Sequence, residues 1–237
     1  MDKSKKYKKK YSKQQEIAKD KITASSYSVE DAVELLKKLT YVKFDEACDI
    51  AINLGVDTKK SDQLVRGTLL LPHGTGKKVK VAAIADGDDL EIAKKAGADI
   101  VGHLDLVNSI KSGKIDFDVC LATKNVMGEI KQLARILGPK GLMPNLKSGT
   151  ITDNIKLTIE NTKKGQISFR TDKGGTVHAL IGKMSFPTKN LIENADATIK
   201  AILKAKPSTV KTNYLRSIYL SGTMTPSVAI EIKNFLT

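Results

Sequence analysis

The sequence predicts a two-domain α/β protein in which a doubly wound, three-layer domain is inserted into a domain built from both chain ends. Three observations support this prediction. The chain has 237 residues, which is enough for two ordinary hydrophobic cores. Between residues 74 and 163, apolar strands alternate with helices of about ten residues, as in a parallel sheet covered on both faces. On either side of this region the pattern changes to half-buried strands and amphipathic helices.

The first part of the outer domain is predicted to contain one helix and two strands. Ser28 can cap a helix over 28–39, because acidic residues occupy its first turn and apolar residues recur at helical spacing. Residues 47–56 alternate apolar and polar side chains, which indicates a strand with one buried face. A second strand is expected over 64–72, where Pro72 ends it.

The inserted domain is predicted over 74–163. Its expected strands are 79–85, 99–102 and 117–123, and its expected helices are 88–98, 104–114, 125–137 and 153–165.

After residue 163 the sequence returns to the half-buried strands and amphipathic helices of the outer domain. Strands 165–171 and 175–182 are expected to form a hairpin across the turn 172–175, followed by a helix from Thr188 to Lys206 and a strand over 214–222. The outer domain is therefore predicted over 1–73 and 164–237. Glycines near the two crossings make them candidate hinges, at His73, Gly74, Gly76, Lys164 and Gly165.

The charge balance predicts a partner that carries phosphates. Forty Lys and Arg residues face 26 Asp and Glu residues, for a net charge of +14. Segment 1–21 is a basic arm with a charge of +6, and 164–237 carries +7. The arm could be a solvated tail, although Tyr7 and Tyr11 within it favour contact with unpaired RNA bases. No apolar run is long enough for a membrane span or a signal peptide, so a cytoplasmic protein without membrane partners is expected.

The sequence does not carry the motifs of an enzyme. Lys78 stands where a phosphate-binding P-loop needs Ser or Thr, and acidic residues follow the strand 79–85 where a dinucleotide-binding fold needs glycines. Three isolated histidines suggest no clustered site, and Cys48 and Cys120 are expected to be buried thiols. We therefore expect no catalytic residue, no metal and no cofactor.

Polar and basic residues of the outer domain outline one candidate surface. Lys43 and Phe44 lie in the link after the first helix, where Phe44 could equally be a core residue. Cations and hydroxyls recur on the strands around 170–185, and small polar residues surround Met224 in 221–227. Together these segments predict an RNA-binding face.

The sequence resembles the large-subunit ribosomal protein family called L-one, the proteins of the ribosomal stalk or side protuberance. The blocks "KFDE", "DQLVRGTLLLPHGTGK", "GADIVG", "DFDVCLAT", "MGEIKQLARILGPKGLMPN", "FRTDKGGTVHALIGKMSF" and "RSIYLSGTMTPS" carry the resemblance, which covers nearly the whole chain. It implies a discontinuous RNA-binding domain with an inserted Rossmann-like domain. It also implies a non-enzymatic protein, monomeric when free, that binds ribosomal RNA at the mobile stalk among other ribosomal components.

The same resemblance implies two further roles: the release of deacylated tRNA from the exit site and the repression of the protein's own messenger RNA. The RNA-binding residues that it implies are Lys43, Phe44, Glu46, Arg170, Asp172, Lys173, Thr176, His178, Lys183, Ser185, Ser221, Thr223, Met224 and Thr225.

This chain departs from the family pattern in two places. Gly222 and Thr225 flank Thr223 and Met224 where the family has a threonine before the pair and a glycine after it, and Leu146 replaces a proline. The family's signature loop, 138–145, is expected to hold Lys140 on a rigid knob that touches a second RNA.

Two alternative functions remain at this point. A small-molecule enzyme or regulator could use the inserted domain, which would then need a pocket with perturbed titratable groups. A sequence-specific DNA regulator would need a recognition helix rich in Arg, Asn and Gln, and the helices here carry mostly Lys, Glu and aliphatic residues.

Overall fold

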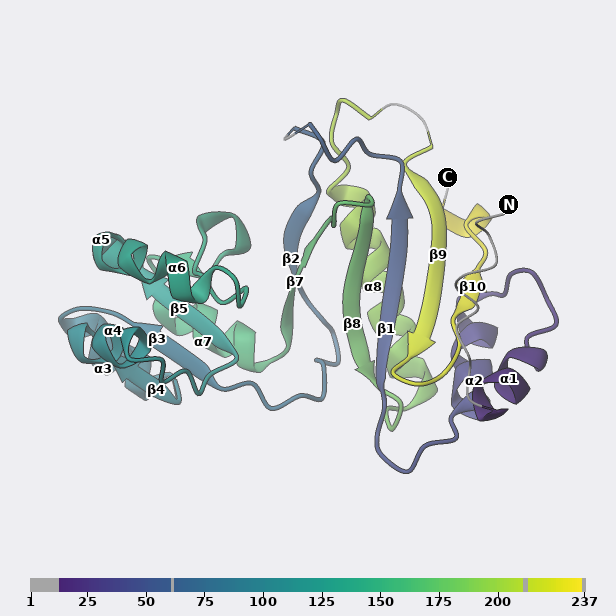
Figure 1. Cartoon of the computed structure of the whole chain (residues 1–237), viewed down its shortest axis with the longest axis horizontal. Coiled ribbons are helices and arrows are strands. Elements are labelled where there is room, and N and C mark those ends of the chain that lie inside the picture. Colours follow the sequence, from purple (N-terminus) through teal and green to yellow (C-terminus); the bar gives the residue numbers. More distant parts are fainter. Residues whose placement is uncertain (1–12, 61, 211–212, 236–237) are drawn as a thin grey trace, which may run out of the picture.

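The computed structural model of the chain describes residues 13–60, 62–210 and 213–235, and its elements form two groups (Figure 1). One group holds an antiparallel sheet in the strand order β10-β9-β1-β8, and the other holds a parallel sheet in the order β4-β3-β5-β6. A two-stranded ribbon of β2 and β7 lies between the two groups. The predicted two-domain α/β class is confirmed.

The antiparallel group is assembled from both chain ends. Its strands are β1 (Ala47–Leu54), β8 (Thr176–Lys183), β9 (Leu215–Gly222) and β10 (Val228–Ile230). The helices α2 (Val29–Leu39) and α8 (Thr188–Lys204) pack on one face of this sheet. In β1 the even-numbered side chains are buried in the core below that face, as the alternation predicts. Ser28 caps α2 by accepting a hydrogen bond from the N–H of Asp31 at 3.1 Å.

The expected pairing of strands 165–171 and 175–182 in a hairpin is wrong. The turn between the two strands forms, with a bridge between Thr171 and Val177, but β7 (Gln166–Arg170) pairs with β2 (Arg66–Leu70) instead of β8. Thr171 explains the exchange of partners, because its Oγ1 and backbone N–H make hydrogen bonds of 2.9 Å with the backbone of Val65, directly before β2. The ribbon therefore leaves the antiparallel sheet at this point.

The parallel group has the layers that the sequence predicts. Its strands are β3 (Val81–Ile84), β4 (Ile100–Gly102), β5 (Val119–Thr123) and β6 (Ile151–Thr152). The helices α3 (Asp88–Lys95) and α7 (Ile155–Lys163) cover one face, and α4 (Leu104–Lys111) with the segment 124–137 covers the other. All four residues of β3 are fully buried, which is typical of a central parallel strand.

The single helix expected over 125–137 is wrong. The chain alternates between 3₁₀ turns and short α-helical turns: η2 (Lys124–Val126), α5 (Met127–Ile130), η3 (Lys131–Leu133) and α6 (Ala134–Leu137). Gly128 lowers the helical propensity of this segment, by about 1 kcal/mol relative to alanine. Ile130, Leu133 and Leu137 are buried against the sheet, and this burial holds the turns in place although the α-helical hydrogen bonds are not continuous.

The sequence patterns missed several short elements. These are α1 (Lys13–Asp20), β6, β10, η4 (Leu146–Ser148) and η5 (Lys233–Phe235). The helix α1 lies within the segment 1–21 that was expected as a basic arm, while Tyr7 and Tyr11 lie outside the described residues. Within the described ranges no helix is both long and apolar enough to cross a membrane.

The two crossings between the groups touch each other. A Cβ atom added at Gly165 would lie 2.5 Å from the Cα atom of Gly74, so both backbones pass at a distance that only glycine allows. We propose that the domain bounds lie here, as 1–73 with 164–237 and as 74–163.

Candidate nucleic-acid interface

Three chain segments meet at one end of the antiparallel sheet, because β1 begins where β8 and β9 end. The N–H of Ala47 donates to Oγ1 of Thr223 at 3.1 Å, and the N–H of Met184 donates to the carbonyl of Glu46 at 2.9 Å. We call this end, with Lys43, Phe44, Lys183, Ser185, Thr223 and Met224, the convergent end. Residues from both halves of the discontinuous domain are thus joined by direct hydrogen bonds.

The link before β1 places Phe44 at the surface. Its side chain is 53% exposed, which excludes the alternative of a core phenylalanine. The neighbouring Asp45, which the sequence reasoning missed, orients two predicted residues. Its carboxylate accepts from the N–H of Ser185 at 3.1 Å and from its Oγ at 2.9 Å, and its carbonyl accepts from Nζ of Lys183 at 3.3 Å.

Glu46 and Thr225 lie beneath this surface, unlike the exposed residues predicted with them. Glu46 is fully buried, and within the described chain neither carboxylate oxygen makes a hydrogen bond of normal geometry. Burial raises the pKa of Glu46, and the backbone N–H of Met224 opposes this rise in part. The carboxyl group therefore sits directly below the Thr223–Met224 turn.

The two departures from the family pattern at 222 and 225 compensate for each other. Oγ1 of Thr225 accepts the N–H of Gly222 at 2.8 Å, and a Cβ atom at position 222 would lie only 2.4 Å from that oxygen. The same Cβ atom would lie 2.5 Å from Oε2 of Glu46. The side chains of Thr225 and Glu46 therefore both require glycine at 222, and Thr223 and Met224 remain exposed between positions 222 and 225.

The remaining predicted residues form a second group at the other end of β8. We call Arg170, Asp172, Lys173, Thr176 and His178 the far cluster; an eight-residue strand spans about 23 Å. Oδ1 of Asp172 accepts the N–H groups of Gly174 and Thr176, each at 2.8 Å, which builds the turn between β7 and β8. These N–H groups lower the pKa of Asp172, and that of Thr176 has the largest effect. The other carboxylate oxygen of Asp172, Oδ2, lies 3.9 Å from Nε2 of His178.

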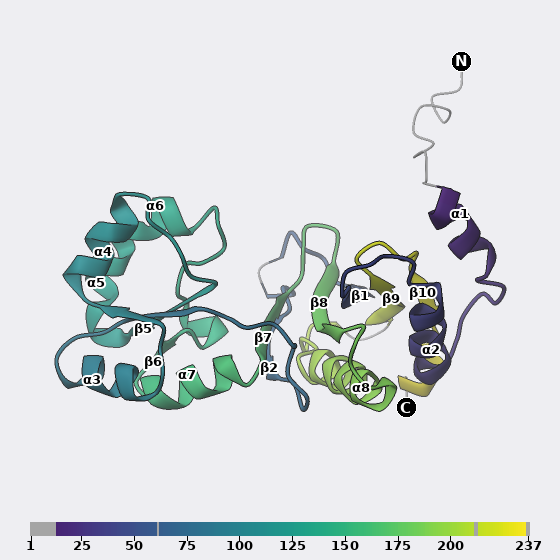
Figure 2. The ribbon, with the colours of Figure 1, turned by 90° about the horizontal axis from the view of Figure 1, so that it is seen from below.

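An uncovered sheet face connects the convergent end with the far cluster. No helix of the described chain covers the face of β1 and β8 opposite α2 and α8 (Figure 2). Across this face the strand register aligns His178, Ala51 and Tyr219, and one step along it aligns Asp49 with Ser221. Burial raises the pKa of Asp49, and the nearby His178 reduces this rise.

Sequence reasoning missed three polar residues on this face, although the alternation in β1 and β9 marks their outward positions. They are Asp49, Ser217 and Tyr219.

The N-terminal helix lies beside the convergent end. Nε2 of Gln15 donates to the carbonyl of Met224 at 3.3 Å, and the hydroxyl of Tyr41 donates to the same oxygen at 3.1 Å. Between α1 and residues 224–227 there is a hollow of about 440 Å³. The hydrogen bond of Gln15 thus holds α1 against the Thr223–Met224 turn.

The crossing at His73 and Gly74 is fastened to α8 by a buried asparagine. Oδ1 of Asn194 accepts the N–H of His73 at 3.1 Å, while Nδ2 donates to the carbonyls of Gly74 at 3.0 Å and Ile181 at 2.8 Å. Nε2 of His73 also contacts Oε2 of Glu193 at 2.6 Å. Of the expected hinge residues, His73 and Gly74 are therefore anchored, while Gly76 and Lys164 are exposed.

The loop 138–145 continues the last helical turn and then closes it. The N–H of Leu142 bonds to the carbonyl of Leu137, and that of Gly141 to Gly138, in the pattern of a Schellman motif. Gly141 takes the left-handed conformation this motif needs, with φ of 72°. Lys140 is exposed at the tip, and Leu146 is 55% exposed after the loop.

The described residues offer little for cofactor chemistry. They contain no group of three or more His, Cys, Asp or Glu side chains placed to hold a metal ion. Both cysteines are buried, and burial raises the pKa of Cys48 and of Cys120 to about 12, so neither thiol ionises near neutral pH.

Comparison with known proteins identifies the family. Residues 36–226 match the model of the ribosomal protein L1p/L10e family. "Large ribosomal subunit protein uL1" of Aromatoleum aromaticum is 52% identical over 206 residues, covering 87% of this chain and 89% of that protein. The proteins of the same name from Rickettsia rickettsii (Sheila Smith) and Orientia tsutsugamushi are 50% and 49% identical, covering 91% and 95% of this chain and 90% and 91% of their own lengths. The chain belongs to the ribosomal protein L1p/L10e family.

Proposed function

We propose that the protein is a structural, non-enzymatic component of the large ribosomal subunit and binds large-subunit rRNA through the convergent end, the open sheet face and the far cluster. The observation that carries this proposal is the meeting of three segments at the convergent end, joined by the hydrogen bond between Ala47 and Thr223. The relatives, which are named as proteins of the large subunit, support the ribosomal location.

The chemistry of this surface suits folded RNA. Lys43, Lys183, Arg170 and Lys173 can contact phosphates, which supply most of the affinity of such complexes. Thr223 accepts one hydrogen bond from the protein, and its O–H group remains available to a 2′-hydroxyl or phosphate oxygen. Phe44, Met224 and Tyr219 add exposed apolar and aromatic area on which ribose and bases can pack.

We also propose the finer roles that the family resemblance implies. The rRNA site is at the mobile stalk, and the exposed tip at Lys140 contacts tRNA in the exit site and assists its release when deacylated. The protein represses its own messenger through a copy of the rRNA site, and it is a cytoplasmic monomer when it is not on the ribosome. The Schellman motif supports the tRNA role, because it presents Lys140 from a fixed backbone.

Capture of RNA from a lysate, followed by sequencing of the bound fragments, tests the proposal. We expect one large-subunit rRNA segment and the protein's own messenger to be enriched. With about four to six phosphates contacted, the logarithm of the affinity should fall with the logarithm of salt concentration with a slope of about −3 to −5. A slope near zero, or random fragments, would contradict the proposal.

A chain that lacks residues 74–163, with the crossings joined by a short glycine linker, separates the roles of the domains. We expect it to keep most of its rRNA affinity, because the convergent end lies in the antiparallel group. Lys111→Ala on α4 is the matched control in the full chain and should leave rRNA affinity unchanged. Loss of rRNA binding in a deletion variant that is still folded would refute the division.

A further inference from the structure

The ribbon of β2 and β7 has two faces of different character. Phe169 is buried against Gly67, and Leu69 and Ile167 pack on the core of the antiparallel group. The other face carries three pairs of residues, Arg66 with Arg170, Thr68 with Ser168 and, at its end, Leu70 with Gln166. The side chains of the first two pairs are all exposed, so this polar part of the ribbon is open.

The two arginines form a cross-strand pair of like charges, which is unfavourable by itself. Neither makes an ion pair anywhere within residues 13–60, 62–210 and 213–235 (the salt bridges there involve other residues). The nearby acids are engaged elsewhere. Asp118 contacts Nζ of Lys77 at 2.6 Å, and Asp172 accepts the N–H groups of its own turn. The arginine pair therefore lacks a counterion from the described protein.

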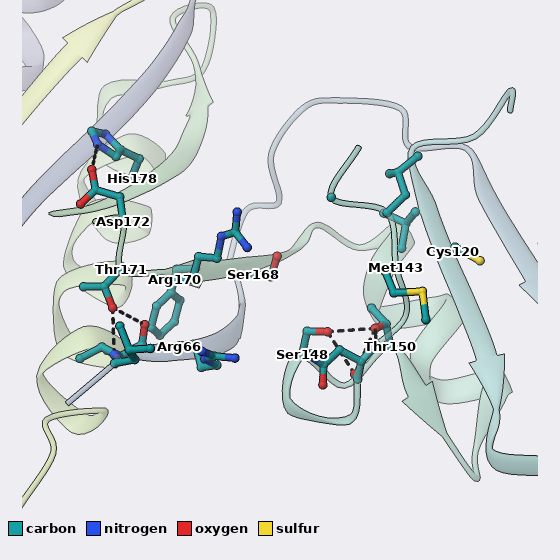
Figure 3. A pocket seen from close by; sticks show the side chains of 18 of the residues that line it. Arg66, Cys120, Met143, Ser148, Thr150, Ser168, Arg170, Thr171, Asp172 and His178 are labelled. Atoms are coloured by element: carbon teal, nitrogen blue, oxygen red, sulfur yellow. Dashed lines mark hydrogen bonds and ion pairs between the residues drawn. The ribbon is translucent and has the colours of Figure 1, made fainter. Parts of the chain in front are cut away.

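The pair faces a cleft of about 900 Å³ between the ribbon and the inserted domain (Figure 3). Lys173 also lines the cleft. Asp172 and His178 lie on the same side as Arg170, and Met143, Ser148 and Thr150 lie on the opposite wall. The turn η4, which includes Ser148, lies against β2 and limits the cleft on that side. A ligand in this cleft would touch both groups of elements at once.

We propose that Arg66 and Arg170 together bind a phosphodiester group of an RNA strand that lies in this cleft, with the inserted domain as its second wall. Two guanidinium groups can bind the oxygens of one phosphate with paired hydrogen bonds, and Ser168, two residues from Arg170 along β7, adds a hydroxyl on the same face. The inference rests on the proposed RNA-binding function. It adds Arg66, which lies in a family block but is not among the RNA-binding residues that the resemblance implies, and it gives the segment 143–150 a role in RNA binding.

Charge-removing variants measure the contribution of the pair. Arg66→Gln should weaken binding of the captured rRNA fragment about tenfold and reduce the steepness of the salt dependence by about one, because one phosphate contact is lost. Lys94→Gln on the distant helix α3 removes the same charge from an exposed site and should change neither quantity. Without RNA, Arg66→Gln should unfold at the same temperature as the wild type or higher, because it removes the repulsion.

A tethered cleavage reagent locates the strand. The native cysteines are buried with raised pKa values, so a thiol introduced by Ser148→Cys can be labelled selectively with an iron chelate that cuts nearby RNA. We expect cuts in one short rRNA segment, and their loss when Arg66→Gln is added. Inorganic phosphate should displace this strand only at concentrations far above that of the RNA.

The outcomes distinguish this inference from the proposed function. If the wild type binds no rRNA, both fail. If the wild type binds rRNA but Arg66→Gln binds equally well with the same salt dependence, or no cuts arise from position 148, the cleft site alone is refuted. Displacement by inorganic phosphate without loss of the rest of the complex, together with absent cuts, would mean that the pair holds a free anion only, and it would also overturn the inference.

Discussion

Asn194 offers the sharpest test of how the crossing at His73 and Gly74 is held. Its side chain is fully buried and makes three hydrogen bonds, two to the crossing and one to the carbonyl of Ile181 in β8. Asn194→Ala removes all three at once. It leaves one backbone N–H and two carbonyls without their partner, and it frees the crossing from α8.

The magnitude follows from the surroundings of each lost bond. The carbonyl of Ile181 is buried, so leaving it unpaired costs about 2 kcal/mol. The groups of His73 and Gly74 are partly exposed and can bind water instead, which reduces their cost to about 0.5 kcal/mol each. The free energy of unfolding should thus fall by about 3 kcal/mol. With a urea m-value of about 2 kcal/mol per molar, the midpoint should fall by about 1.5 M.

The assay is urea unfolding of the whole chain, followed by circular dichroism, with Lys189→Ala as the control. Lys189 is exposed on the same helix, so its substitution should change stability by less than about 0.5 kcal/mol. A fluorophore pair with one dye in each domain should also report a wider distribution of interdomain distances for Asn194→Ala. An unchanged midpoint with an unchanged distance distribution would refute the argument that this residue anchors the crossing.

Three further predictions concern the convergent end. Thr223→Ala and Met224→Ala should each weaken rRNA binding by about 1 to 3 kcal/mol in a filter-binding or fluorescence assay, and wild-type affinity in both variants would exclude the proposed contact. Gly222→Ala should lower the free energy of unfolding by about 1 to 3 kcal/mol through overpacking, and the double variant with Thr225→Gly should recover only part of this loss, because the added Cβ atom still meets Oε2 of Glu46 at 2.5 Å; additive losses would show that the sites at 222 and 225 are independent. Because burial raises the pKa of the Glu46 carboxyl group above 4.5, the folded state binds this proton more tightly than the unfolded chain, and the wild type loses stability as the pH rises from about 4.5 through the folded pKa. Glu46→Gln should therefore be more stable than the wild type at pH 7 but not near pH 4. Urea unfolding at both pH values measures this difference.

Local patterns were sufficient for the elements that are long and regular. The alternation in β1 marks its buried face correctly, and the Ser28 cap and the apolar spacing of α2 locate that helix. In contrast, β6 has two residues and β10 has three, so neither is long enough to show a period. The pairing of β7 with β2 depends on Thr171 bonding to Val65, more than 100 residues earlier, which no local pattern contains.

The same distinction applies to the candidate interface. Motifs pointed to segments such as 43–46 and 221–225, because a short run of residues carries each of them. The alignment of His178, Ala51 and Tyr219 depends on the register of three strands, and the arginine pair depends on a pairing that the sequence did not reveal. The burial of Glu46 and the coupling of Gly222 to Thr225 likewise depend on tertiary contacts.

The central position of β1 in its sheet has a consequence for synthesis. Ala47 meets its hydrogen-bond partner Thr223 only 176 residues later in the chain. Because translation proceeds from the N-terminus, β1 stays without one of its two neighbours until β9 has emerged. A nascent chain therefore cannot form the convergent end before Thr223 has been synthesised, so this part of the fold is completed late.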